Sequence, residues 1–337
     1  MIRSAVATVY ALTFLLPFRT TASTGSGTAA ASLDVTIREW DLPASGELPH
    51  DPAVGPDGAL WYTAQKANRI GRLDPVSGKI TEYKLPTPNS GPHGLAADRD
   101  GNIWYTGNYV GLIGKLDPKT GHVAEYRMPD PRASDPHTPV FDQHGILWFT
   151  VQRGNMVGRL DPASGKFALR EVPTPDATPY GIAVNHAGVP FFCEFGSNKL
   201  ASIDPQTLQI TEYALPASAR PRRLAIAQDD TIYYSDYARG YLGSLDPKTG
   251  RVREWASPGG PSSKPYGIAI TRDGMIWYSE SGVEPNTIVR FDPKQQVFAR
   301  AAIPSGGGVV RNMAAMPDGR VYIACSGVNK VGVVARQ

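Results

Sequence analysis

Apolar and polar residues alternate with a period of two over most of the chain, in short runs that end at Gly, Pro, Asn or Asp. Each unit of the pattern begins with a short apolar run, such as residues 94–98, and a turn such as Arg-Asp-Gly follows it. An aromatic run, a run ending in Asp-Pro and a last run stopped by Pro complete the unit. This period is typical of β-strands and not of helices. The pattern therefore predicts four strands in each unit.

The unit occurs seven times along the chain. In each repeat we define the anchor residue as the one directly after a recurring proline, or directly after the residue that replaces this proline. The seven anchor residues are His50, His93, His137, Tyr180, Arg222, Tyr266 and Arg311. Successive anchors are 42 to 45 residues apart. Regular repeats of this length with four strands each are typical of propeller blades. The sequence therefore predicts an all-β fold, a seven-bladed β-propeller with four-stranded blades.

The ends of the chain indicate how this ring closes. The last repeat has only three strands before Gln337, whereas residues 34–43 resemble an isolated fourth strand. We expect that N-terminal strand to complete the seventh blade beside residues 328–336. Such closure removes strand edges that would otherwise invite aggregation.

The first residues have the pattern of an export signal. Arg3 is followed by an apolar run over residues 5–18 and by a stretch rich in small residues over 20–32. The apolar run is too short to span a bilayer, so it predicts a cleaved signal peptide. We therefore expect a signal peptide and small-residue linker over residues 1–31 and one propeller domain over 32–337. The expected location is periplasmic or extracellular, without membrane attachment after cleavage.

Charge and cysteine content narrow the classes of partner. The 34 basic and 31 acidic residues give a formal charge of +3, without a basic stripe, which argues against nucleic-acid binding. The two cysteines, Cys193 and Cys325, fall in blades four and seven, too far apart for a disulfide. We predict two free, buried thiols and a monomer whose partner is a small-molecule or peptide ligand.

The anchor residues are the first candidates for chemistry, since innermost strands border the central channel and their starts form a ring at one mouth. Histidines occupy this position in three adjacent blades, and imidazoles act as bases, acids or metal ligands. Three convergent imidazoles suit zinc better than magnesium. A shared metal, a polar ligand-facing wall and a structural role for the histidines all remain open. In the wall, Tyr180 and Arg222 would join the three histidines.

A second ring follows from the residue that ends each aromatic strand. Three carboxylates occupy it in blades four to six, across the ring from the histidines: Glu194, Asp236 and Glu280. They are candidates for a ligand-binding funnel that is basic on one side and acidic on the other. The alternative is that they cap nearby loops.

The recurring motifs PHGL or PYGI, DGxIWYT, IGRLDP and ITEYxLP carry a family resemblance. Over residues 34–336 the chain resembles the virginiamycin B lyase (streptogramin B lyase) family. The resemblance implies a seven-bladed propeller that linearises a cyclic depsipeptide antibiotic, and hence a role in antibiotic resistance. The implied reaction is a magnesium-assisted β-elimination, in which the metal polarises an ester carbonyl and an imidazole removes the neighbouring proton.

The family's base and metal-binding segments lie in its last two blades, and they map onto Tyr266, Arg311 and Val309. All three depart from the family pattern, because neither tyrosine nor arginine is a good base and valine cannot bind a metal. Three hypotheses follow. The protein is a lyase that uses His50, His93 and His137, a non-catalytic propeller that binds a ligand or protein, or a lactonase-type hydrolase with a metal near the three carboxylates.

Overall fold

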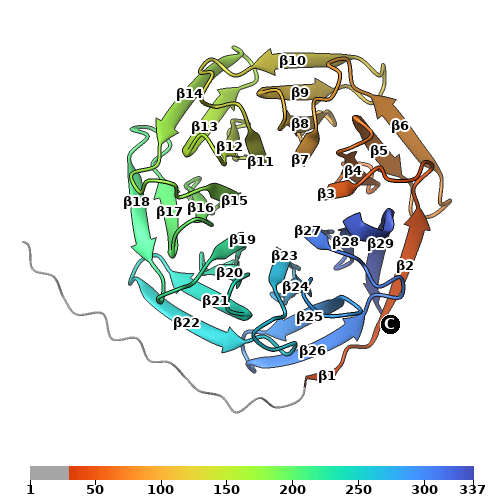
Figure 1. Cartoon of the computed structure of the whole chain (residues 1–337), viewed down its shortest axis with the longest axis vertical. Helices are drawn as coiled ribbons and strands as arrows, with labels where there is room; N and C mark the ends of the chain where they lie inside the picture. Colours follow the sequence, from red (N-terminus) through yellow and green to blue (C-terminus); the bar gives the residue numbers. More distant parts are fainter. Residues whose placement is uncertain (1–29) are drawn as a thin grey trace, which may run out of the picture.

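The computed structural model describes residues 30–337 and confirms seven four-stranded antiparallel blades arranged around one axis (Figure 1). In each blade the second strand carries the aromatic run and is wholly buried, because it packs against both neighbouring blades. The predicted signal peptide lies outside the described residues, apart from positions 30 and 31. No helix within residues 30–337 is long and apolar enough to cross a membrane.

The strands fall into four concentric sets. The innermost strands are β3 (Pro49–Val54), β7 (Pro92–Ala97), β11 (Pro136–Phe141), β15 (Pro179–Val184), β19 (Pro221–Ile226), β23 (Pro265–Ile270) and β27 (Val310–Ala315). The second strands are β4 (Leu60–Ala64), β8 (Ile103–Gly107), β12 (Leu147–Val151), β16 (Pro190–Glu194), β20 (Ile232–Asp236), β24 (Ile276–Glu280) and β28 (Val321–Cys325).

The outer half of each blade completes the sheet. The third strands are β5 (Arg69–Leu73), β9 (Leu112–Leu116), β13 (Met156–Asp161), β17 (Lys199–Ile203), β21 (Tyr241–Asp246), β25 (Thr287–Asp292) and β29 (Lys330–Arg336). The outermost strands are β6 (Ile80–Lys84), β10 (Val123–Arg127), β14 (Lys166–Glu171), β18 (Ile210–Ala214), β22 (Arg251–Ala256), β26 (Val297–Ala302) and β2 (Val35–Asp41). One 3-10 turn, Ser326–Val328, precedes β29.

The Asp-Pro turns between third and fourth strands have the chemistry that the sequence indicates. The Asp74 carboxylate accepts a hydrogen bond from the backbone N–H of Val76 at 2.9 Å. Gly78 takes a positive φ of 76°, which a residue with a Cβ adopts only at a cost. The same Asp-capped turn recurs at Asp117 and Asp246, so these repeats are turn signals and not sites.

The N-terminal strand closes the ring as predicted. Strand β2 pairs antiparallel with β29, from Val35 opposite Arg336 to Asp41 opposite Lys330. The residues before it add a contact that the sequence did not indicate, because β1 (Ala31–Ser32) pairs parallel with β26 at the outer edge of blade six. The N-terminal segment therefore spans two blades.

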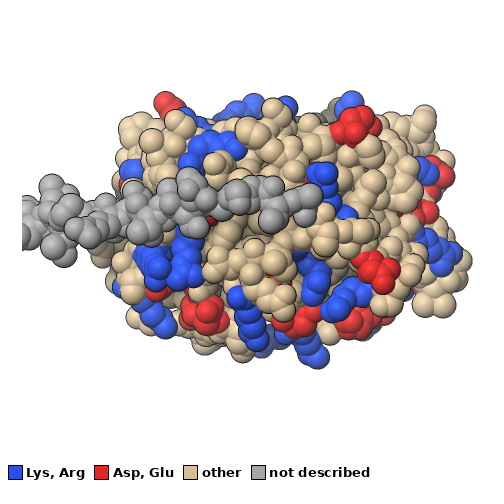
Figure 2. Space-filling model, turned by 90° about the horizontal axis from the view of Figure 1, so that it is seen from below, with Lys and Arg blue, Asp and Glu red and all other residues tan. Residues whose placement is uncertain are grey.

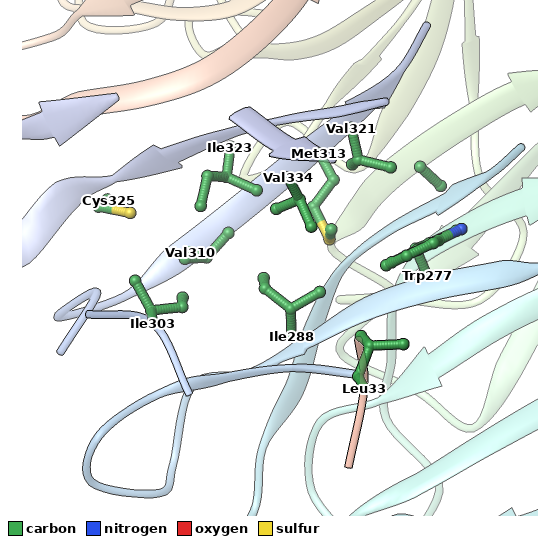
Figure 3. Packing of buried hydrophobic residues seen from close by; sticks show 11 residues of the cluster. Leu33, Trp277, Ile288, Ile303, Val310, Met313, Val321, Ile323, Cys325 and Val334 are labelled. Carbon is green, nitrogen blue, oxygen red and sulfur yellow. The ribbon is translucent and has the colours of Figure 1, made fainter. Parts of the chain in front are cut away.

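Leu33 joins these two blades through their hydrophobic interface. It is 8% exposed and packs in a cluster with Ile288 and Ile303 of blade six and Val310 and Val334 of blade seven (Figure 3). Cys325 belongs to the same cluster, and both it and Cys193 are buried and unpaired, as predicted. Basic and acidic side chains are interspersed on the face shown in Figure 2.

Candidate functional site

A β-bulge at the start of every innermost strand presents two consecutive side chains near the axis. In blade one Pro49 pairs with Ala64 and Pro52 with Tyr62, so His50 and Asp51 together face the single residue Thr63. The same register shift occurs in all seven blades. Bulges re-aim side chains and are common beside functional sites. Each blade therefore contributes its anchor residue and the residue after it to the centre of the ring.

A hydroxyl on the second strand fixes the bulge and joins it to the next blade. Thr63 Oγ1 accepts from the backbone N–H of Asp51 at 3.0 Å and donates to the carbonyl of His93 at 2.9 Å. Four blades use this bridge to the next anchor, through Thr63, Thr106, Thr150 and Ser235. The anchor backbone is therefore held from two sides, which limits the positions that its side chain can take.

The position after the anchor alternates between glycine and larger residues around most of the ring. Glycine occupies it in blades two, four and six, whereas Asp51, Thr138, Arg223 and Asn312 occupy it in the odd blades. A Cβ on Gly94 would lie 2.2 Å from the carbonyl oxygen of His137, and one on Gly181 would lie 2.8 Å from Cα of Arg223. Glycine is therefore required where the next blade approaches most closely.

The three anchor histidines form a continuous stack, so the structure brings together the first group that the sequence singled out. Ring centroids of His50 and His93 are 3.8 Å apart, as are those of His93 and His137, and Tyr180 extends the stack at 4.0 Å from His137. All four side chains are buried. Burial lowers the pKa of His50 to about 4 and holds the pKa values of His93 and His137 well below the ordinary value. The three imidazoles are therefore neutral at pH 7.

A buried ion pair crosses the axis beneath the anchors. Asp51 accepts hydrogen bonds from the Arg223 guanidinium at 2.8 and 3.1 Å and from the Asn312 amide at 3.1 Å. Arg223 also donates to Thr138 Oγ1 at 3.2 Å, so four blades meet in one network. Burial alone raises the pKa of Asp51, but the Arg223 charge and the His50 hydrogen bond hold it below its usual range.

Asp51 also orients the first histidine. The Nδ1 atom of His50 lies 2.9 Å from the Asp51 carboxylate, which favours the tautomer with the proton on Nδ1. Nε2 is then the ring nitrogen left to accept a proton or a hydrogen bond. This is the arrangement of a carboxylate–histidine base, although the low pKa of His50 makes it a weak one.

Blades four to six carry a different chemistry, an arginine among aromatic rings. The Arg222 guanidinium lies 3.9 Å from the ring centroid of Tyr266, 4.3 Å from that of Tyr237 and 4.7 Å from that of Phe195. Its contact with the Tyr180 ring is 5.0 Å. The hydroxyl groups of Tyr180 and Tyr266 contact each other, and burial raises the pKa of Tyr266 above its usual range. Cation–π contacts therefore hold Arg222 in place.

The three second-ring carboxylates lie in loop contacts. Glu194 accepts from Ser197 Oγ at 2.8 Å, Asp236 from Arg239 Nε at 2.6 Å, and Glu280 from Ser257 Oγ at 2.6 Å. Burial raises the pKa of Glu194 to about 7. Within the described chain, no hydrogen bond or ion pair joins any of the three to an anchor side chain. Such contacts are expected of side chains that cap loops, which was the alternative to a ligand-binding funnel.

A divalent metal does not fit the centre of the ring. The ligand atoms of His50, Asp51 and His93 lie within 4.8 Å of one another, a spacing that suits a metal. Both Asp51 oxygens already accept from Arg223, however, and two further arginines, Arg222 and Arg311, occupy the ring. Magnesium needs free carboxylate oxygens, and the family-equivalent positions supply none. The side chains that meet at the axis therefore lack the free oxygen ligands that a magnesium ion requires.

Sequence reasoning overlooked the residues that follow each marked position. Asp51 and Arg223 stand one residue after an anchor, and Phe195 and Tyr237 stand one residue after the second ring. Comparing the seven repeats at the position after the anchor reveals Asp51 and Arg223, both in odd-numbered blades. The position after the second ring reveals Phe195 and Tyr237 in adjacent blades. Two grooves lie elsewhere, at the turns that end innermost strands, with volumes of about 560 and 430 Å³.

The neutral histidines predict a loss of stability in acid. An unfolded chain takes up a proton at His50 with the ordinary pKa near 6.5, whereas the folded chain resists it down to about pH 4. Stability therefore falls as the pH falls through this window, by about 3 kcal/mol for His50 alone. Thermal melts from pH 7.5 to 4 measure it. We expect H50Q to flatten the curve and the exposed control H122Q to leave it unchanged; equal slopes in all three proteins would contradict the assignment.

Both the sequence and the fold of this chain match known proteins. The profile of the Virginiamycin B lyase family matches residues 19–197 and 166–337. A streptogramin B lyase structure is 26% identical, with a TM-score of 0.83, and covers 90% of this chain and 98% of its own. The virginiamycin B lyase of Staphylococcus aureus is 26% identical, with a TM-score of 0.81, covering 90% and 99%.

A further solved structure shows a ligand. It is a catalytically inactive histidine-to-alanine variant of the S. aureus lyase with quinupristin, 25% identical, with a TM-score of 0.81 and coverage of 90% and 99%. The hydrazine synthase of Kuenenia stuttgartiensis is 15% identical with a TM-score of 0.72, which shows a shared fold alone. No curated protein sequence matches the chain.

Proposed function

Since this chain belongs to the virginiamycin B lyase family, we propose that it is an exported propeller that binds a small cyclic peptide or related ester at its anchor ring and does not cleave it. The observation that carries the proposal is the chemistry of blades six and seven. Arginine and buried tyrosine stand there, at the positions of the base and metal ligands that the family resemblance implies.

The ring has the features of a small-ligand site. Aromatic side chains, neutral imidazoles and guanidinium groups converge on the axis, and rigid strands hold them. Binding sites of small ligands combine apolar walls with a few placed polar groups. The family resemblance adds the class of ligand, and a relative with quinupristin supports a cyclic depsipeptide as the first probe.

Several facts argue against the family's elimination. Removing a proton beside an ester carbonyl requires a base whose pKa is near the working pH. Burial raises the pKa of Tyr266, and burial lowers the pKa of His50 to about 4, so both are poorly matched. Val309 offers no side-chain oxygen to a metal.

The proposal of export rests on the basic and apolar pattern of residues 1–31.

The His50–Asp51 pair supports a second candidate, metal-independent cleavage of an ester. Asp51 holds Nδ1, and Nε2 of His50 would act as the base while a guanidinium stabilises the negative oxygen. The low pKa of His50 predicts a slow reaction at best, so binding is the better supported function.

Incubation with a streptogramin B tests both candidates. Calorimetry measures binding, and liquid chromatography with fragment mass spectrometry follows the ligand over several hours. We expect binding and one unaltered ligand peak. A product of unchanged mass and altered retention would show elimination, a product heavier by one water would show hydrolysis, and either would overturn the non-catalytic proposal. H50Q then identifies the base, and absence of binding would exclude this ligand class.

A further inference from the structure

Three arginines surround the axis, but only one has an acidic partner. Arg223 pairs with Asp51 and is 2% exposed. Arg222 and Arg311 are partly exposed, and among residues 30–337 no carboxylate lies within ion-pair distance of either guanidinium. The three anchor histidines are neutral and therefore do not change the charge of the ring. The ring therefore presents two uncompensated positive charges, one from blade five and one from blade seven, on either side of Tyr266.

Both guanidinium groups also have few hydrogen-bond acceptors among the described residues. The Nε atoms of Arg222 and Arg311 are buried without a partner in the described chain. The one hydrogen bond of Arg222 is a long contact of 3.4 Å to the Tyr180 hydroxyl. Buried donors without acceptors are costly, and charged ones more so. A ligand that brings acceptor oxygens to the other nitrogens of these guanidinium groups would give both charges hydrogen-bond partners.

The surroundings select the kind of anion. A guanidinium lying on aromatic faces keeps its edges free, and those edges match the two oxygens of a carboxylate. Phe195 and Tyr237, which pack on Arg222, offer apolar contact beside the charge. A cation is repelled by the same arginines. The site thus suits a carboxylate joined to an apolar group.

We propose that Arg222 and Arg311 form an anion site that binds the carboxylate of a small organic ligand, with Phe195 and Tyr237 beside its apolar part. This inference rests on the proposed function, since it names the chemistry of a ligand at the same ring. Guanidinium groups supply here the positive charge that a metal supplies in the reaction implied by the family resemblance.

Calorimetric titration with benzoate and with its neutral isostere benzamide tests the charge requirement. We expect benzoate to bind and benzamide to bind at least about tenfold more weakly, since charge-assisted hydrogen bonds are about twice as strong as neutral ones. R222Q and R311Q should each weaken benzoate binding at least about tenfold. R311K keeps the positive charge but loses the pair of parallel N–H donors, so its affinity for benzoate should lie between those of the wild type and R311Q. The surface variant R132Q should bind like the wild type.

Thermal melts without ligand verify that each variant is folded. R311Q is informative even if R222Q unfolds, because the Arg311 side chain makes no hydrogen bond with any residue of 30–337. Equal binding of benzoate and benzamide, or benzoate binding unaffected by R311Q, would overturn the anion site. Inorganic phosphate binding as tightly as benzoate would overturn the carboxylate assignment. Benzoate binding without streptogramin binding would support the site and refute the cyclic-peptide ligand. Streptogramin binding that R222Q and R311Q leave unchanged would support the cyclic-peptide ligand and refute the anion site.

Discussion

Replacing Asp51 by alanine is expected to lower the free energy of unfolding by about 3–5 kcal/mol. The substitution leaves Arg223 buried on the axis without its counter-ion, and it also removes acceptors from Asn312 and His50. Such an uncompensated buried charge is among the most costly single changes in a folded protein. Chemical denaturation of D51A and the wild type at pH 7.5 measures the difference.

Two matched variants separate the charge from the loss of packing. The double variant D51A/R223M removes both charges and should recover a large part of the loss, because apolar replacements of buried ion pairs are often neutral. D57A breaks a surface ion pair with Arg72 and should cost less than about 1 kcal/mol. If D51A were no more costly than D57A, the cross-axis pair would not stabilise the ring.

Removal of the closing strand is the second large effect. A chain that begins at residue 43 lacks β2, and we expect it to aggregate or to lose several kcal/mol of the 5–15 kcal/mol typical of a domain. The loss exposes the hydrogen-bonding edge of β29 and removes Leu42, which packs among the buried residues of blades seven and one. Exposed edges of this kind pair with other chains.

Size-exclusion chromatography and thermal melting compare this chain with one that begins at residue 34. Of the described residues the longer chain lacks only 30–33, which include β1 and Leu33, and we expect it to elute as a monomer with a small loss of stability. Adding a peptide of residues 34–43 should restore the shorter chain in proportion to peptide concentration. A shorter chain that is monomeric and melts like the longer one would show that β2 is not needed for closure.

The blade count, the closing strand and the unpaired cysteines were all predictable, because each depends on spacing that repeats along the chain. Anchor spacing places Cys193 and Cys325 in distant blades before any coordinate is known. The pairing of β1 with blade six was not predictable, since two residues carry no strand pattern.

The site was predictable in part. Repeat position brought His50, His93 and His137 together correctly, because equivalent positions lie at equivalent radii. The ion pair of Asp51 with Arg223 joins residues 172 positions apart, and only the closed ring and the bulge make them neighbours. Glu194 and Glu280 show the opposite case. Their repeat position is regular, but the strand end carries them into buried loop contacts.

The alternation of glycine and larger residues after the anchors has a consequence for ring size. A strict alternation of two kinds of blade closes only on an even number of blades, so a ring of seven must contain one junction between two blades of the same kind. That junction lies between blades seven and one, where Asn312 meets Asp51 without an intervening glycine. The end strands β2 and β29 lie beside this junction, since both belong to blade seven.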